Sequence, residues 1–141
     1  AVYTLDPTGR AGRLKGLARV LQTGVISKYV LGNADAPWFG GSASVTTAFL
    51  KDKPDLAKRY IAAYAKAVEW VRKNPDESRT HLDGFTAIDA SLVKEVPLSG
   101  FTLYNEFTAS DIDYFQKFFD VFSDRKIFSR VVPVKPLIYT A

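Results

Sequence analysis

The chain has 141 residues and a mass of 15.6 kDa, enough to form one domain or part of a larger one. Its 19 basic and 15 acidic residues give a net charge of +4, which is mildly cationic and lacks the dense basic patch of nucleic-acid-binding proteins. We therefore expect no nucleic-acid partner. The chain has no cysteine and one histidine, His81, so disulfides, thiolate metal sites and multi-histidine sites are excluded, and we expect no metal or cofactor. No apolar run approaches the roughly 18 residues that span a bilayer.

The N-terminal residues Ala1–Leu5 are typical of a buried strand, and they run directly into a turn. Ligands in open α/β sheets bind outside the carboxyl ends of strands. A ligand contact is therefore expected at this turn, from Asp6, Pro7, Thr8 and Gly9. The abrupt apolar start also indicates a fragment of a longer chain.

A second short strand is predicted over Leu17–Thr23, and a buried strand over Gly40–Thr47 is entered through a glycine pair. The aromatic pair Trp38 and Phe39 precedes these glycines, which would allow a small molecule to reach the main-chain N–H groups. The residues expected to contact a ligand here are Trp38, Gly40, Gly41 and Ser42.

Helical periodicity dominates the next part of the chain. Apolar residues recur at helical spacing from Leu56 to Val71, and Pro54 suits a first turn, which together predict a helix over 54–73. Asn74-Pro75 predicts the start of a second helix that ends near Gly84, and a third is expected over 89–96.

The C-terminal part carries an aromatic stripe at spacing i, i+3, i+4, i+7, formed by Phe115, Phe118, Phe119 and Phe122. A run from Ser110 to Asp113 resembles a capping box and predicts the start of a helix whose stripe packs in a core. The stretch 131–139 alternates and holds two prolines, so an edge strand or an extended tail is expected.

No catalytic constellation is evident, and we expect the protein not to be an enzyme. His81 has no candidate nucleophile or second ligand near it in the sequence, and paired acids such as Asp76/Glu77 lie in helix first turns, where the helix dipole accounts for them. An enzyme would need Asp6 or His81 to have a strongly shifted pKa inside a pocket.

Several of these segments in their order resemble a known family. The segments that carry the resemblance are Leu5-Asp6-Pro7-Thr8-Gly9, the strand Gly40–Thr47 leading into Ala48-Phe49-Leu50, Lys53-Pro54-Asp55, and a long helix that ends at Asn74-Pro75-Asp76-Glu77. The pattern resembles the C-terminal half of the solute-binding proteins of nitrate, sulfonate, taurine and thiamine-precursor ABC importers. The stretch 39–79 carries the resemblance most specifically.

The resemblance implies an α/β fold, a fragment of the two-lobed periplasmic-binding-protein fold, with short strands followed by several C-terminal helices. Residues 1–36 would finish the second lobe and form the return crossover. Residues 37–141 would supply the C-terminal part of the first lobe with its closing helices, and the N-terminal half of the protein would be absent. The same resemblance implies that Asp6-Pro7 faces the cleft and that Trp38, Gly40, Gly41 and Ser42 line it.

The implied function is solute binding for an ABC importer, without catalysis. A small anionic ligand (sulfonate, nitrate or carboxylate) or a pyrimidine-like ligand would be captured between two lobes and delivered to a membrane permease. The implied location is the periplasm, or outside the membrane on a lipid anchor. Implied partners are the permease, the missing N-terminal lobe and a second copy through the exposed lobe face. The alternative is a stand-alone α/β ligand-sensing or regulatory domain with no role in transport.

Overall fold

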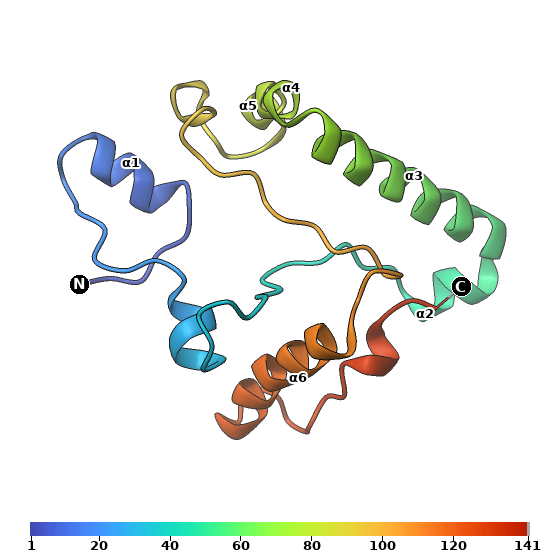
Figure 1. Ribbon diagram of the computed structural model, residues 1–141. Helices are drawn as coiled ribbons and strands as arrows, with labels where there is room; N and C mark the ends of the chain where they lie inside the picture. The colour runs from blue at the N-terminus through green and yellow to red at the C-terminus, as the bar shows by residue number, and fades with distance from the viewer. Residues whose placement is uncertain (141) are drawn as a thin grey trace. The chain divides into compact units, whose positions relative to one another are not determined.

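The computed structural model describes residues 1–140, and it is all-helical: 51% of the chain is helix and no strand is present among these residues. Figure 1 accordingly shows helices joined by irregular chain. The prediction of an α/β fold with short strands is therefore wrong. A strand needs a neighbouring strand to pair its N–H and C=O groups, and within the described part of the chain the segments 1–5, 17–23 and 40–46 have no such neighbour. Val2 is 88% exposed and Leu17 80%, so these segments are not buried either.

The chain divides into two compact units, each of which is described separately below. Unit 1 comprises residues 1–21 and 45–101, and unit 2 comprises residues 22–44 and the chain from 102 onward. The division into 1–36 and 37–141 that the resemblance implies remains a prediction.

Unit 1 holds most of the helices. They are α1 (Thr8–Leu14), α2 (Thr47–Asp52), α3 (Pro54–Lys73), α4 (Pro75–Thr80), the short turn α5 (Leu82–Phe85) and the 3₁₀ turn η2 (Ala90–Leu92). The hydroxyl of Thr46 caps α2 by accepting a hydrogen bond from the N–H of Phe49 at 3.1 Å. Pro54 and Pro75 are the first residues of α3 and α4, where a missing N–H costs nothing.

Helix α3 has the bounds that its periodicity predicts. It buries Ala57 and Val68 against the rest of unit 1. A neighbouring face remains exposed and carries Leu56, Tyr60 and Tyr64. Exposed large apolar side chains in a row are typical of surfaces that contact another molecule or segment.

The two helices predicted after α3 are shorter in the structure. The predicted helix from Asn74 to Gly84 is interrupted after Thr80, and the backbone leaves helical geometry at Asp83 and Gly84, where glycine adopts a φ of +81°. The predicted helix over 89–96 is reduced to η2, whose first N–H groups are capped by Asp89.

Unit 2 is built around α6 (Ala109–Asp124), with the π-helical turn η1 (Ile26–Val30) and the 3₁₀ turn η3 (Lys135–Leu137). A capping box is present, but Thr108 and Asp111 form it rather than the predicted run from Ser110: each side chain accepts a hydrogen bond from the other residue's N–H. The start of α6 therefore lies close to its predicted position, with a different cap.

The aromatic stripe of α6 makes contacts between its rings, and these rings are half-buried rather than fully buried in a core. Phe115 lies edge-on to Phe119 at 5.0 Å between ring centroids, and Phe118 lies edge-on to Phe122 at the same distance. Phe128, beyond the helix, contacts Phe119 and Phe122 in turn. Such ring pairs stabilise a core beyond the area that they bury.

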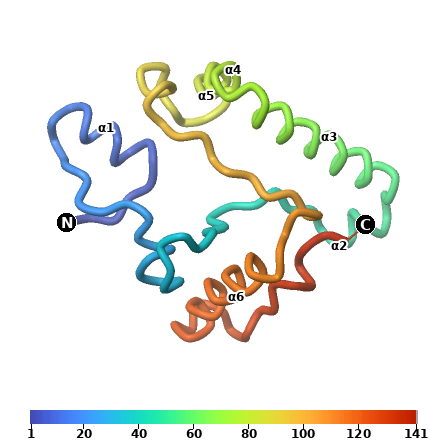
Figure 2. Tube along the Cα trace, viewed as in Figure 1, coloured from blue at the N-terminus to red at the C-terminus, as the bar shows by residue number. Residues whose placement is uncertain are grey.

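Polar side chains of α6 fix the segments on both sides of the helix. The ammonium group of Lys117 donates to the carbonyl of Leu31 at 2.6 Å, and the amide oxygen of Gln116 accepts from the N–H of Val134 at 2.8 Å. Figure 2 shows the chain after α6 turning back along the helix. Leu31 and Val134 are the most deeply buried side chains of the structure, at 1% and 0% exposure, so these bonds hold the core of unit 2 together.

Candidate functional site

The best candidate for a binding site is a partly open cavity inside unit 1, with a volume of about 480 Å³. Small-molecule pockets are commonly of roughly 300–1,000 Å³. Its walls are mainly apolar, with one carboxylate and several hydroxyls among them. The lining residues are Asp6, Val71, Ser78, Leu82, Thr86, Ile88, Val96, Pro97, Leu98, Ser99 and Phe101.

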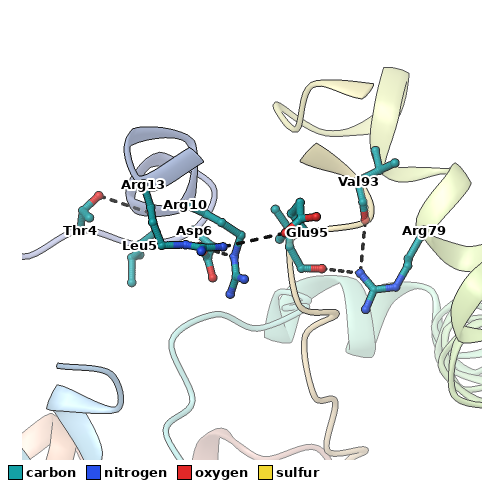
Figure 3. A network of polar contacts seen from close by, with 9 residues as sticks. Thr4, Leu5, Asp6, Arg10, Arg13, Arg79, Val93 and Glu95 are labelled. Carbon is teal, nitrogen blue, oxygen red and sulfur yellow. Dashed lines mark hydrogen bonds and ion pairs between the residues drawn. The ribbon is translucent and has the colours of Figure 1, made fainter. Parts of the chain in front are cut away.

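One wall of the cavity is held in place by Arg79 of α4. The Nη1 group of Arg79 donates to the carbonyl of Val93 at 3.2 Å and also to the carbonyl of Val96. Both bonds are drawn in Figure 3. Val96 is 5% exposed and lines the cavity, and the chain that follows it forms the rest of this wall. A planar guanidinium that bonds two carbonyls fixes the turn between them.

Asp6 lines the cavity just before α1. Its carboxylate accepts a hydrogen bond from Nε of Arg10 at 3.4 Å, and both side chains are about one-third exposed. Arg13, one turn further along α1, forms an ion pair with Glu95 at 3.9 Å. Figure 3 shows both contacts, of which the pair of Arg13 and Glu95 connects α1 with the segment that carries the cavity wall. These exposed pairs position Asp6 more than they stabilise the fold.

The turn predicted to bind a ligand thus contributes Asp6 to the cavity, whereas Pro7, Thr8 and Gly9 do not line it. Thr8 and Gly9 are the first residues of α1. A Cβ on Gly9 would lie 3.0 Å from the methyl group of Thr4, so this glycine accommodates a neighbouring side chain. Of the four residues predicted at this turn, one therefore lines the cavity, and the strand at whose end they were expected does not form.

The second predicted segment, Trp38 to Ser42, belongs to unit 2. The indole ring of Trp38 lies so close to Gly40 that a Cβ there would be 2.6 Å from it. The same ring lies edge-on to Phe118 at 6.3 Å. The close approach that the glycine pair predicted is therefore made at Gly40 by the chain's own tryptophan. A Cβ on Gly41 would meet no atom within 4 Å, and the hydroxyl of Ser42 lies 3.0 Å from that of Ser44.

Reading the sequence did not identify the wall formed by Val96, Pro97, Leu98, Ser99 and Phe101. Pro97 was interpreted only as the end of a helix. No local pattern brings this segment to Asp6, which is far away in the chain, because the contact depends on long-range packing around Arg79 and Glu95. The one available signal was a proline and a glycine that flank Leu98 and Ser99, which is typical of many loops.

His81 lies at the junction of α4 and α5 and packs between rings. Its imidazole is 6.0 Å from Trp70 and 6.2 Å from Phe85, between centroids. Within residues 1–140, no group of three or more histidine, cysteine or acidic side chains is placed to hold a metal ion. No helix in the same range is long and apolar enough to cross a membrane.

Comparison with known proteins adds no relative: no family model, no curated protein and no solved structure matches this chain. Function must therefore be inferred from the cavity and from the sequence motifs.

Proposed function

We propose that this protein is the solute-binding component of an ABC importer, and that it binds a small ligand without transforming it. The observation that carries the proposal is the position of Asp6. The sequence singled out this residue as a ligand contact, and its carboxylate lines a cavity of about 480 Å³ with apolar walls. A concave apolar site with a few polar groups is the usual form of a small-molecule binding site.

The arrangement of helices in the stretch 39–79 gives further support. The motifs that carry the family resemblance coincide with helix boundaries: Thr46 caps α2, Pro54 begins α3, and Asn74-Pro75 separates α3 from α4. These motifs therefore have a structural meaning in this chain, even though the α/β fold that came with the resemblance is absent from residues 1–140.

The exposed apolar surface of unit 1 supports the proposed partners. Tyr3 and Leu5 are more than half exposed, and the row on α3 that includes Leu56 and Tyr60 is nearly half exposed. We assign this surface to the N-terminal lobe of the same protein, with a second copy as the other occupant that could cover it. The ligand-loaded protein would then dock on a membrane permease, in the periplasm or outside a membrane to which it is anchored by lipid.

The test is thermal unfolding of the natural gene product that contains this chain, scanned against nitrate, sulfonates, carboxylates, pyrimidines and small amines or amidines. A ligand at about 100 times its Kd stabilises the native state by about 2.7 kcal/mol, which raises Tm by roughly 5–10 °C for a protein of 150–250 residues. One ligand class should produce such a shift. No shift with any class would contradict the proposal.

Two matched variants locate the binding. Leu98→Trp fills the cavity wall and should abolish the shift, whereas Leu14→Trp, on α1 and outside the cavity, should preserve it. Equal loss in both variants would argue against this cavity.

The alternative, a ligand-sensing or regulatory domain, also predicts a ligand-induced shift. The two are separated by solute uptake in cells that lack the gene. Uptake of the identified ligand should fall in the importer case and stay unchanged in the regulatory case.

A further inference from the structure

Three polar groups of the cavity in unit 1 offer hydrogen-bond acceptors: the carboxylate of Asp6 and the hydroxyls of Ser78 and Thr86. Among the described residues that line it, Asp6 is the only charged one, and its carboxylate is an acceptor. Within the same residues, the wall contains no lysine or arginine side chain. A ligand that enters this cavity therefore meets negative charge and apolar surface.

The hydroxyls of Ser78 and Thr86 in the wall offer a ligand acceptors and no donor, because each donates its proton within the chain. Ser78 is 6% exposed, and its hydroxyl donates to the carbonyl of Asn74 at 2.7 Å, so only its oxygen lone pairs remain for a ligand. The hydroxyl of Thr86 donates to the carbonyl of Leu82 and accepts from the N–H of Ile88 at 3.1 Å. Both hydroxyl protons are thus used within the chain.

The arginines that surround the cavity direct their charge elsewhere. The guanidinium of Arg72 donates to the carbonyl of Phe101, and that of Arg79 donates to the carbonyl of Val96. Both guanidinium groups therefore bond the backbone carbonyls of residues that line the cavity. The guanidinium of Arg10, by contrast, bonds the carboxylate of Asp6, so this cation is paired with the acid that lines the cavity.

We propose that this cavity selects a small ligand with an apolar body and a cationic, hydrogen-bond-donating head, such as an amine or an amidine, and rejects acceptor-only anions such as sulfonates and carboxylates. The inference rests on the proposed function, since it specifies the ligand of the same site. The head would bond to the carboxylate of Asp6, and the body would cover Val96, Leu98 and Phe101.

Arg10 has a defined part in this selectivity. Its Nε bonds the carboxylate of Asp6 at 3.4 Å, so it competes with the ligand's head for the same oxygen atoms. Both side chains are about one-third exposed, and an ion pair of this kind contributes little and is readily exchanged. Removing Arg10 should therefore strengthen the binding of a cationic ligand.

The experiment uses probes that match in shape and differ in charge: benzamidine and benzylamine against benzoate and benzenesulfonate, with benzyl alcohol as the neutral member. Binding to the full chain is measured by calorimetric titration. The carboxylate of Asp6 forms charge-assisted hydrogen bonds with an amidinium and repels a carboxylate, so benzamidine should bind at least roughly tenfold tighter than benzoate.

Two variants and two controls test the assignment to Asp6. Asp6→Asn should weaken the binding of benzamidine roughly tenfold and leave the binding of benzyl alcohol unchanged. The control is Asp52→Asn, because Asp52 is an exposed acid of α2 outside the cavity, and this variant should bind both probes as the original chain does. Arg10→Gln should tighten benzamidine roughly twofold to fivefold, whereas Arg19→Gln should not. The Arg10 variant keeps the test decisive if the Asp6 variant fails to fold.

The outcomes separate the inference from the proposed function. Binding of benzoate or benzenesulfonate as tight as that of benzamidine would overturn the selectivity and leave a solute-binding protein with different specificity. Amidine binding that is unchanged in both Asp6→Asn and Arg10→Gln would also overturn it. If neither these probes nor the broader ligand panel bind, both the selectivity and the proposed function are wrong.

Discussion

Replacing Arg79 by methionine should loosen the cavity wall and lower the stability of unit 1. Arg79 bonds the carbonyls of Val93 and Val96 through one nitrogen, and Val96 is buried at 5% exposure. Methionine keeps most of the apolar stem and removes both bonds, so the measured loss reports the bonds rather than the packing.

The expected loss of stability follows from the hydrogen bonds that the carbonyls of Val93 and Val96 lose. A hydrogen bond to a charged group contributes about 1.5–3 kcal/mol when it is shielded from water. The side chain of Arg79 is only half-buried, so water can partly replace it at the more accessible carbonyl of Val93. We therefore expect the free energy of unfolding of unit 1 to fall by about 2 kcal/mol.

The two tryptophans allow unit 1 to be measured alone. Trp70 belongs to unit 1 and Trp38 to unit 2, so urea unfolding in a Trp38→Phe background reports on Trp70. Hydrogen exchange at the amides of residues 93–101 should accelerate in the same variant. The matched control is Arg59→Met on an exposed part of α3, which should change the stability by less than about 0.5 kcal/mol.

The reasoning is refuted if Arg79→Met and Arg59→Met lower the stability equally. It is also refuted if exchange at residues 93–101 is unchanged while the variant is destabilised, because the bonds would then not hold this wall.

Two further predictions concern unit 2 and the pH dependence. Leu31→Ala should lower the free energy of unfolding of unit 2 by about 2–5 kcal/mol because Leu31 is 1% exposed, whereas Leu137→Ala, at 62% exposure, should cost less than about 0.5 kcal/mol. Trp38 fluorescence during urea unfolding measures both in a Trp70→Phe background, and equal costs would contradict the assignment of the core. The hydroxyl and the N–H of Ser91 bond the carboxylate of Asp89 at 2.7 and 2.9 Å and lower its pKa below the ordinary 3.8. This contribution to stability is present above pH 3.8 and lost as the pH falls through the lowered pKa of the folded state. Ser91→Ala should raise the pKa of Asp89 toward its ordinary value in an NMR titration of the carboxyl group, and an unchanged pKa would contradict this cause.

The exposed face of α3 is a surface on which another molecule or segment could pack. Tyr60 and Tyr64 combine a large apolar area with a polar tip, and such residues are enriched where proteins contact other molecules. Their exposure in unit 1 agrees with a surface that another segment or copy covers, as proposed above.

The sequence by itself determined the local elements. Helix α3 has its predicted bounds because one apolar periodicity runs from Leu56 to Val71 and a proline fixes the first turn. Helix α6 and its aromatic stripe followed from the same kind of local pattern, although the capping residue is Thr108. Asp6 was also singled out locally, because a carboxylate before a proline and a glycine is typical of a turn that can present polar groups.

Only the tertiary structure decided what these elements do together. Apolar, β-branched runs such as Ala1–Leu5 predict strands, but a strand forms only where another strand pairs with its backbone, and none does so within residues 1–140. Likewise, the cavity exists because Arg79 and Glu95 bring the segment after Val96 to the side of Asp6. Pairing partners and cavity walls come from distant parts of the chain, and hydrophobic periodicity carries information only about near neighbours.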